Sequence, residues 1–95
     1  MIVRLMGEGQ WEVADGIRAR IDALDADTER AVTAGDMQAL RAALVALHEL
    51  VRSSGKQLDH AHLGASDVVV PPADLDLAEA RELLHGEGLI PDLPA

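Results

Sequence analysis

The spacing of apolar residues between positions 15 and 54 constrains the fold of this chain more than any other feature. Before Gly35, apolar or small residues recur at the three- and four-residue steps of one helical face, at Ile17, Ile21, Leu24, Thr28, Ala31 and Val32. After Asp36 the same steps recur at Met37, Leu40, Leu44, Leu47 and Val51, widened by Ala43 and Leu50. Gly35 suits a left-handed helix end, and Asp36 suits the N-cap of a following helix. The pattern therefore predicts two antiparallel helices joined by a tight turn at 34–36.

A β-hairpin is predicted before the helices. The β-branched run Ile2 to Met6 precedes the turn signal of Gly7 and Gly9, and residues 10–13 follow it. Alternation along strands assigns two faces. We expect Val3, Leu5, Trp11 and Val13 on the core face, and Arg4, Gln10 and Glu12 pointing away.

The segment after the helices is predicted to hold a loop, a strand and a short helix. Residues 55–66 have the polar and glycine-containing composition of a loop, and residues 67–70 form a second β-branched run. Pro71 and Pro72 end this run because proline donates no backbone hydrogen bond, which places the strand at an edge beside the hairpin. Asp76 and Glu79 have the spacing of a capping box at the start of a helix that ends at Gly86.

These elements predict an α+β fold in a single domain of residues 1–95. The expected divisions are a β-hairpin at 1–13, a helical hairpin at 15–54, a loop at 55–66, and a strand, short helix and tail at 67–91. The residues expected to act as structural turns and caps are Gly7, Gly9, Gly35, Asp36, Pro71, Pro72, Asp76, Gly86 and Gly88.

Charge is unevenly distributed along a chain whose formal net charge is −9. Residues 1–58 carry nine acidic and seven basic side chains, whereas residues 59–95 carry eight acidic side chains and one basic one, Arg81. An acidic surface repels phosphate groups, so we expect no nucleic acid and no anionic lipid surface as a direct partner. The longest apolar-rich run, Ala39 to Val51, is shorter than the roughly 20 residues of a membrane-spanning helix. We expect a cytoplasmic protein that binds a basic protein surface.

Recognised catalytic patterns are absent from the sequence. The chain has no cysteine, no serine nucleophile elbow, no Walker-type loop and no complete dinucleotide-binding glycine motif. Acidic pairs such as Asp22 with Asp25 lie at helical spacing on a face expected to be solvated. We therefore expect no enzymatic activity and no cofactor.

One alternative function is a metal- or ligand-responsive sensor. Asp59, His60 and His62 supply two imidazoles and a carboxylate within four residues of a predicted loop, which is a partial set of transition-metal ligands. A structural homodimer formed through the helical hairpin is a further alternative. Trp11, the only aromatic residue, is expected to plug the core, with an interface anchor as the alternative interpretation.

Three motifs give the chain a family resemblance. They are Ile2-Val3-Arg4 with Gly7-Glu8-Gly9-Gln10-Trp11, the Pro71-Pro72 step, and the closing Gly86-Glu87-Gly88-Leu89-Ile90-Pro91. With these motifs around an acidic, alanine-rich helical middle, the chain resembles the PspAA family of PspA-associated proteins over essentially its whole length. Trp11 stands where the family commonly has another aromatic residue, tyrosine.

The resemblance implies a small, non-catalytic accessory of PspA, the helical membrane-remodelling protein of the phage-shock envelope stress response. A PspA partner implies an adaptor that modulates this response and that PspA recruits to the inner face of the membrane. The long helices of PspA are expected to present basic stripes to the acidic C-terminal part. The candidate partner-binding residues are Trp11, Glu79, Glu82, Glu87, Leu89 and Ile90.

Overall fold

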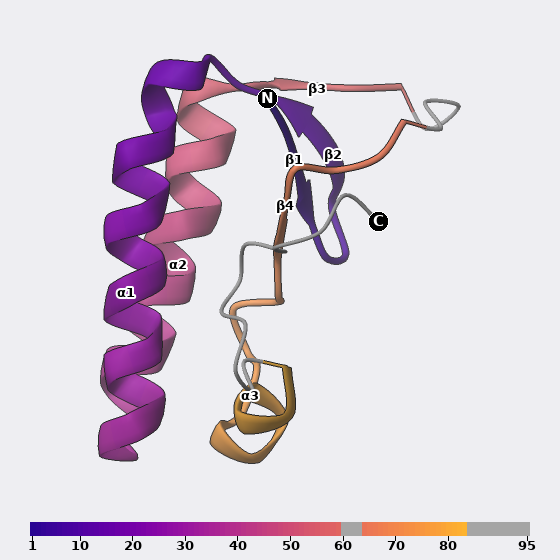
Figure 1. Cartoon of the computed structure of the whole chain (residues 1–95). Helices are drawn as coiled ribbons and strands as arrows, with labels where there is room; N and C mark the ends of the chain where they lie inside the picture. The colour runs from indigo at the N-terminus through magenta and orange to yellow at the C-terminus, as the bar shows by residue number, and fades with distance from the viewer. Residues whose placement is uncertain (60–63, 84–95) are drawn as a thin grey trace.

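The predicted helical hairpin forms one side of the molecule (Figure 1). In the computed structural model, which describes residues 1–59 and 64–83, α1 spans Arg18–Ala34 and α2 spans Met37–Ser54. Gly35 ends α1 with a left-handed φ of 69°, and the Asp36 side chain accepts a hydrogen bond of 3.0 Å from the Ala39 amide. Both local signals are thus confirmed. Residues Asp15–Ile17 form a 3-10 turn, η1, so the α-helix begins at Arg18 and not at the predicted residue 15.

Helix α2 is the central element of the core. It buries a wide face because it packs against α1 on one side and lies beside the sheet on the other (Figure 1). Its buried residues are Leu40, Ala43, Leu44, Leu47, His48, Leu50 and Val51, whereas α1 buries only Ile21, Thr28 and Ala31. The predicted apolar stripes therefore pack the two helices against each other and form much of the core.

The sheet has four strands in the order β3-β2-β1-β4. The predicted hairpin consists of β1, Ile2–Leu5, and β2, Gly9–Glu12, which pair antiparallel. The third predicted strand is β4, Val68–Val70, which lies parallel to β1 at an edge. These strands, together with the helices, confirm the α+β fold class.

The opposite edge of the sheet differs from the sequence prediction. Residues Lys56–Gln57, which fall in the predicted loop over 55–66, form the two-residue strand β3. They pair antiparallel with β2, with Gln57 opposite Trp11 and Lys56 opposite Glu12. So short a strand has no periodicity of its own, and its position is set by the end of α2 directly before it.

The two faces of the hairpin follow the predicted alternation with one exception. Val3, Leu5 and Val13 are buried in the core, and Trp11 packs against it while remaining half-buried. Gln10 lies opposite Arg4 in the register and is predicted to be exposed, but it is buried. Its side-chain amide donates hydrogen bonds of 2.8 Å to the Gly64 carbonyl and the Ser66 hydroxyl, so residues 64–66 cover this part of the outer face.

Helix α3, Leu77–Leu83, begins at the predicted capping box. The Asp76 side chain accepts a hydrogen bond of 2.8 Å from the Glu79 amide, and the Glu79 side chain accepts one of 3.4 Å from the Asp76 amide. Helix α3 lies near the turn that joins α1 to α2 (Figure 1). The predicted helix end at Gly86, and the turn at Gly88, lie outside the described residues.

Candidate functional site

An exposed acidic segment runs from the β4–α3 connection into α3. Its carboxylates belong to Asp74, Asp76, Glu79 and Glu82, all of which are exposed. Asp76 and Glu79 are joined by the capping box, which fixes the start of the helix and the direction of both side chains. The segment is therefore a negatively charged surface on and before a short helix. Its one basic residue, Arg81, is also exposed and lies near Gly35.

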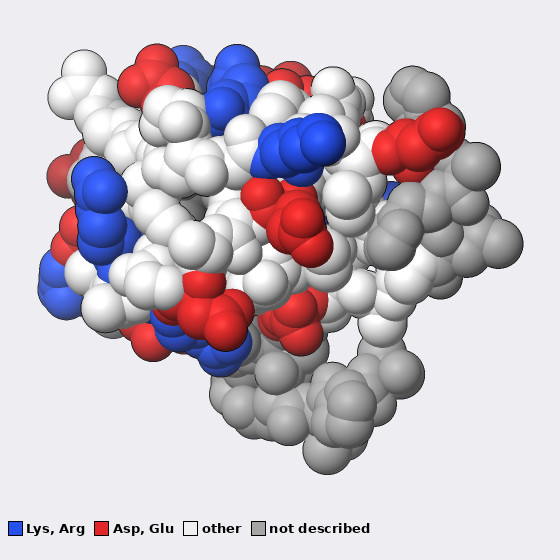
Figure 2. Space-filling model, turned by 90° about the horizontal axis from the view of Figure 1, so that it is seen from above, with Lys and Arg blue, Asp and Glu red and all other residues white. Residues whose placement is uncertain are grey.

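Elsewhere the charges are mixed in sign. Figure 2 shows Lys and Arg side chains interspersed with Asp and Glu side chains on the face seen from above. Ion pairs on α1 join Arg18 to Asp22 and Arg30 to Asp27 along the helix. Such pairing leaves no large field of one sign over these residues, in keeping with the near-neutral balance of the first 58 positions.

Trp11 lies on the core side of β2. Its ring packs against the buried cluster, and its indole Nε1 is shielded from solvent. No described residue accepts a hydrogen bond from this nitrogen. The packing confirms the expectation of a core role, whereas the expected acceptor for the N–H is not found among the described residues.

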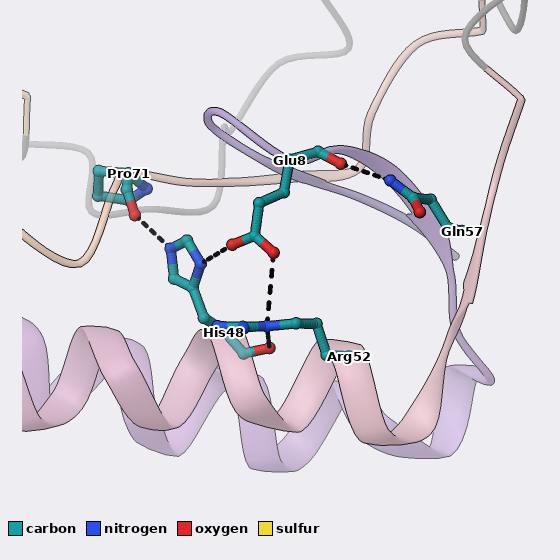
Figure 3. A network of polar contacts seen from close by, with 5 residues as sticks. All are labelled: Glu8, His48, Arg52, Gln57 and Pro71. Atoms are coloured by element: carbon teal, nitrogen blue, oxygen red, sulfur yellow. Dashed lines mark hydrogen bonds and ion pairs between the residues drawn. The ribbon is translucent and has the colours of Figure 1, made fainter.

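A polar network joins three elements at the β1–β2 turn (Figure 3). His48 on α2 is buried, with Nδ1 2.9 Å from the Glu8 Oε2 atom and Nε2 2.7 Å from the Pro71 carbonyl oxygen. Arg52, one turn along α2, places its Nε 3.5 Å from Glu8 Oε1. The Gln57 side-chain amide donates a hydrogen bond of 2.8 Å to the Glu8 carbonyl oxygen. Glu8 is thus held by its carboxylate from α2 and by its backbone from β3.

Sequence reasoning misses this network. It interprets Glu8 as part of a turn signal and His48 as an isolated histidine on a helix. Their 40-residue separation carries no local pattern that links them. The one signal available is position, since His48 follows Leu44 by four residues and Leu47 by one, on the buried side of the helix.

Both nitrogens of His48 are engaged within the protein. The ring is 3% exposed, so neither nitrogen is open to a metal ion or to proton exchange with a bound substrate. Among residues 1–59 and 64–83, no three His, Cys, Asp or Glu side chains gather as a metal-binding group. His60 and His62 lie outside these residues, so the metal-sensor alternative built on them and Asp59 stays a prediction.

A shallow hollow follows the groove between α1 and α2. It has a volume of about 860 Å³ and is lined by small or apolar side chains such as Ala23, Leu24, Ala46 and Leu50. The charged residues that line it, Arg20, Glu49 and Arg52, are all exposed. The hollow therefore lacks the converging, buried polar groups that orient a small ligand.

The structure places the predicted partner-binding residues in separate parts of the molecule. Glu79 and Glu82 share the exposed face of α3, and Trp11 lies apart from them on the core side of the sheet. Glu87, Leu89 and Ile90 lie outside the described residues. The structure thus assembles only the acidic pair on α3 into a common surface.

Comparison with known proteins identifies a family match. A family model described as PspA-Associated protein matches residues 1–92. Searches of curated proteins and of solved structures give no match. In the described part of the chain, every helix is too short or too polar to cross a membrane.

Proposed function

The chain belongs to the PspAA family of PspA-associated proteins, and from this premise we propose that it is a non-catalytic adaptor that binds PspA. The family match carries the proposal, since it covers 92 of the 95 residues. Binding would modulate the membrane-maintenance response that PspA serves. The adaptor would act in the cytoplasm and reach the inner face of the membrane through its partner.

The acidic segment 74–82 is the surface we assign to this contact. It combines exposed carboxylates with a capping box that holds two of them, Asp76 and Glu79, at defined positions before binding. Preorganised charges steer association and determine the orientation of the partner more than they add affinity. The assignment requires a basic stripe on the partner.

The test is a binding measurement with purified PspA by isothermal titration calorimetry at about 50 mM and about 300 mM NaCl. Salt screens exposed charges over a Debye length of about 10 Å at 0.1 M, so we expect binding at low salt that weakens at high salt. An absence of binding at both salt concentrations would reject the proposed function. Binding with equal affinity at both would retain the partner and reject the acidic surface as the contact.

A further inference from the structure

We propose that the groove between α1 and α2 is the interface of a homodimer, in which a second copy of the chain packs its own groove antiparallel against it. The proposal goes beyond PspA binding and gives a defined geometry to a dimer formed through the helical hairpin. The groove faces away from the sheet. Ala46 lines it, and Ala46 lies about 200° around α2 from His48, whose ring contacts the Pro71 carbonyl beside β4.

The groove runs along the hairpin as two adjoining hollows. The first is the hollow that includes Leu24 and Leu50, and the second lies toward the α1–α2 turn and includes Ala31 and Ala43. Ala43 and Ala46, three positions apart on α2, are neighbours on the helix surface and join the two hollows. Every described residue of the lining belongs to α1, α2 or the turn between them. Small side chains here allow another helix to approach closely.

The two hollows carry opposite net charge. Two arginines and one glutamate line the first hollow, which gives a formal charge of +1, whereas one arginine and two aspartates line the second, which gives −1. The six residues, all exposed, are Arg20, Glu49 and Arg52 in the first hollow and Asp27, Arg30 and Asp36 in the second. One end of the groove is therefore weakly basic and the other weakly acidic.

A second copy of the chain matches this charge pattern when it lies antiparallel. A two-fold axis perpendicular to the groove places the first hollow of each copy over the second hollow of the other, so opposite charges meet twice. A parallel arrangement joins each hollow to its own equivalent and brings like charges together. The antiparallel pair of hairpins forms a four-helix bundle. Because the groove is complementary to itself, a second copy is favoured over an unrelated helix.

The size of this face determines the affinity that we expect. Helix α1 has 17 residues, so the face is roughly 26 Å long, and two packed helices make it roughly 20 Å wide. Specific interfaces usually bury about 800 Å² on each partner, which places this face at the small end of the range. We therefore expect a weak dimer with a Kd of about 10–100 µM.

The test is sedimentation velocity of the whole chain without PspA, from about 5 µM to about 500 µM, at low salt. The wild type should pass from monomer to dimer. Arg20→Glu makes both hollows −1, and Asp27→Arg makes both +1. Each change acts twice in a symmetric dimer, so each should raise the Kd about tenfold. The double variant has hollows of −1 and +1 and should return to within about threefold of the wild type.

A wild type that stays monomeric throughout this range overturns the proposal, and so does a double variant as weak as the single ones. Arg20 and Asp27 are exposed, so these variants are expected to fold. Circular dichroism checks that each variant keeps its helical content.

A second pair of variants locates the interface on α2. Ala46→Glu adds a carboxylate beside the boundary of the two hollows, close to the two-fold axis, where it meets its own equivalent. It should raise the Kd more than about tenfold. Val45→Glu is the matched control, since Val45 is 38% exposed, does not line either hollow and lies about 100° around the helix from Ala46. It should stay within about threefold of the wild type. Equal effects, or a dimer lost only in Val45→Glu, would show that the groove is not the interface.

Discussion

At the scale of single residues, Gly55 lies where the end of α2 closely approaches the β-hairpin. A Cβ atom at this position would lie 2.7 Å from Val13 Cγ1, 2.8 Å from the Val51 carbonyl oxygen and 3.0 Å from the Glu12 carbonyl oxygen. Two of these neighbours are backbone atoms, which cannot rotate away. We expect Gly55→Ala to lower the free energy of unfolding by about 1–3 kcal/mol, the usual cost of overpacking.

Chemical denaturation with urea measures this effect, and Gly16→Ala is the matched control. A Cβ atom added at Gly16 would have no neighbour within 4 Å, and the φ angle of Gly16 is not positive. Gly16 should therefore tolerate the methyl group with a change below about 0.5 kcal/mol, as surface substitutions usually do. Equal effects of the two substitutions would contradict the close approach at Gly55.

Some residue roles can be predicted from the sequence and others cannot. Gly35 and Asp36 are predictable because their roles depend on the two helix ends beside them. The burial of Gln10 and the partners of His48 are not, because they depend on segments 54 and 40 positions away. A polar residue that binds a distant backbone carbonyl leaves no periodic pattern, so sequence reasoning assigns Gln10 to the solvent.

At the scale of elements, we expect the N-cap of α2 to contribute measurably to the free energy of unfolding. The Asp36 side chain accepts from the Ala39 amide at 3.0 Å, which satisfies one of the unpaired donors of the first helical turn. Asp36→Ala removes this bond, and we expect a loss of about 0.5–2 kcal/mol in the free energy of unfolding. Asp36→Asn keeps an oxygen acceptor and should stay close to the wild type. Thermal unfolding followed by circular dichroism distinguishes the two, and identical losses would contradict a capping role.

The elements are predictable to the extent that each carries its own pattern. The two helices, the hairpin, β4 and the start of α3 each have a stripe, an alternation or a capping box. Strand β3 has two residues and none of these signals, and it exists through its pairing with β2. The candidate site divides in the same way, since the charge of segment 74–82 is readable from the sequence and the network around Glu8 is not.

At the scale of the whole molecule, we expect PspA binding to depend more on where a charge lies than on the net charge of the chain. Glu82 lies on the exposed acidic face of α3, whereas Glu29 lies exposed on α1. Glu82→Lys and Glu29→Lys change the net charge equally. If the acidic segment contacts PspA, we expect Glu82→Lys to raise the Kd about three- to tenfold at low salt, and Glu29→Lys to change it less than about twofold. Equal effects in a calorimetric titration would show that only overall charge matters.

The pairing of β1 with β4 has a consequence for the order in which the molecule assembles. The hydrogen bond between the Ile2 amide and the Asp67 carboxylate joins positions 65 apart, and the parallel ladder of β1 and β4 begins beside it. During synthesis on the ribosome, the hairpin and both long helices emerge before β4 does. Until then one edge of β1 lacks its partner and is open to association with other nascent chains. Pairing of β4 with β1 closes the long stretch of chain between them, and we expect this step to limit the folding rate.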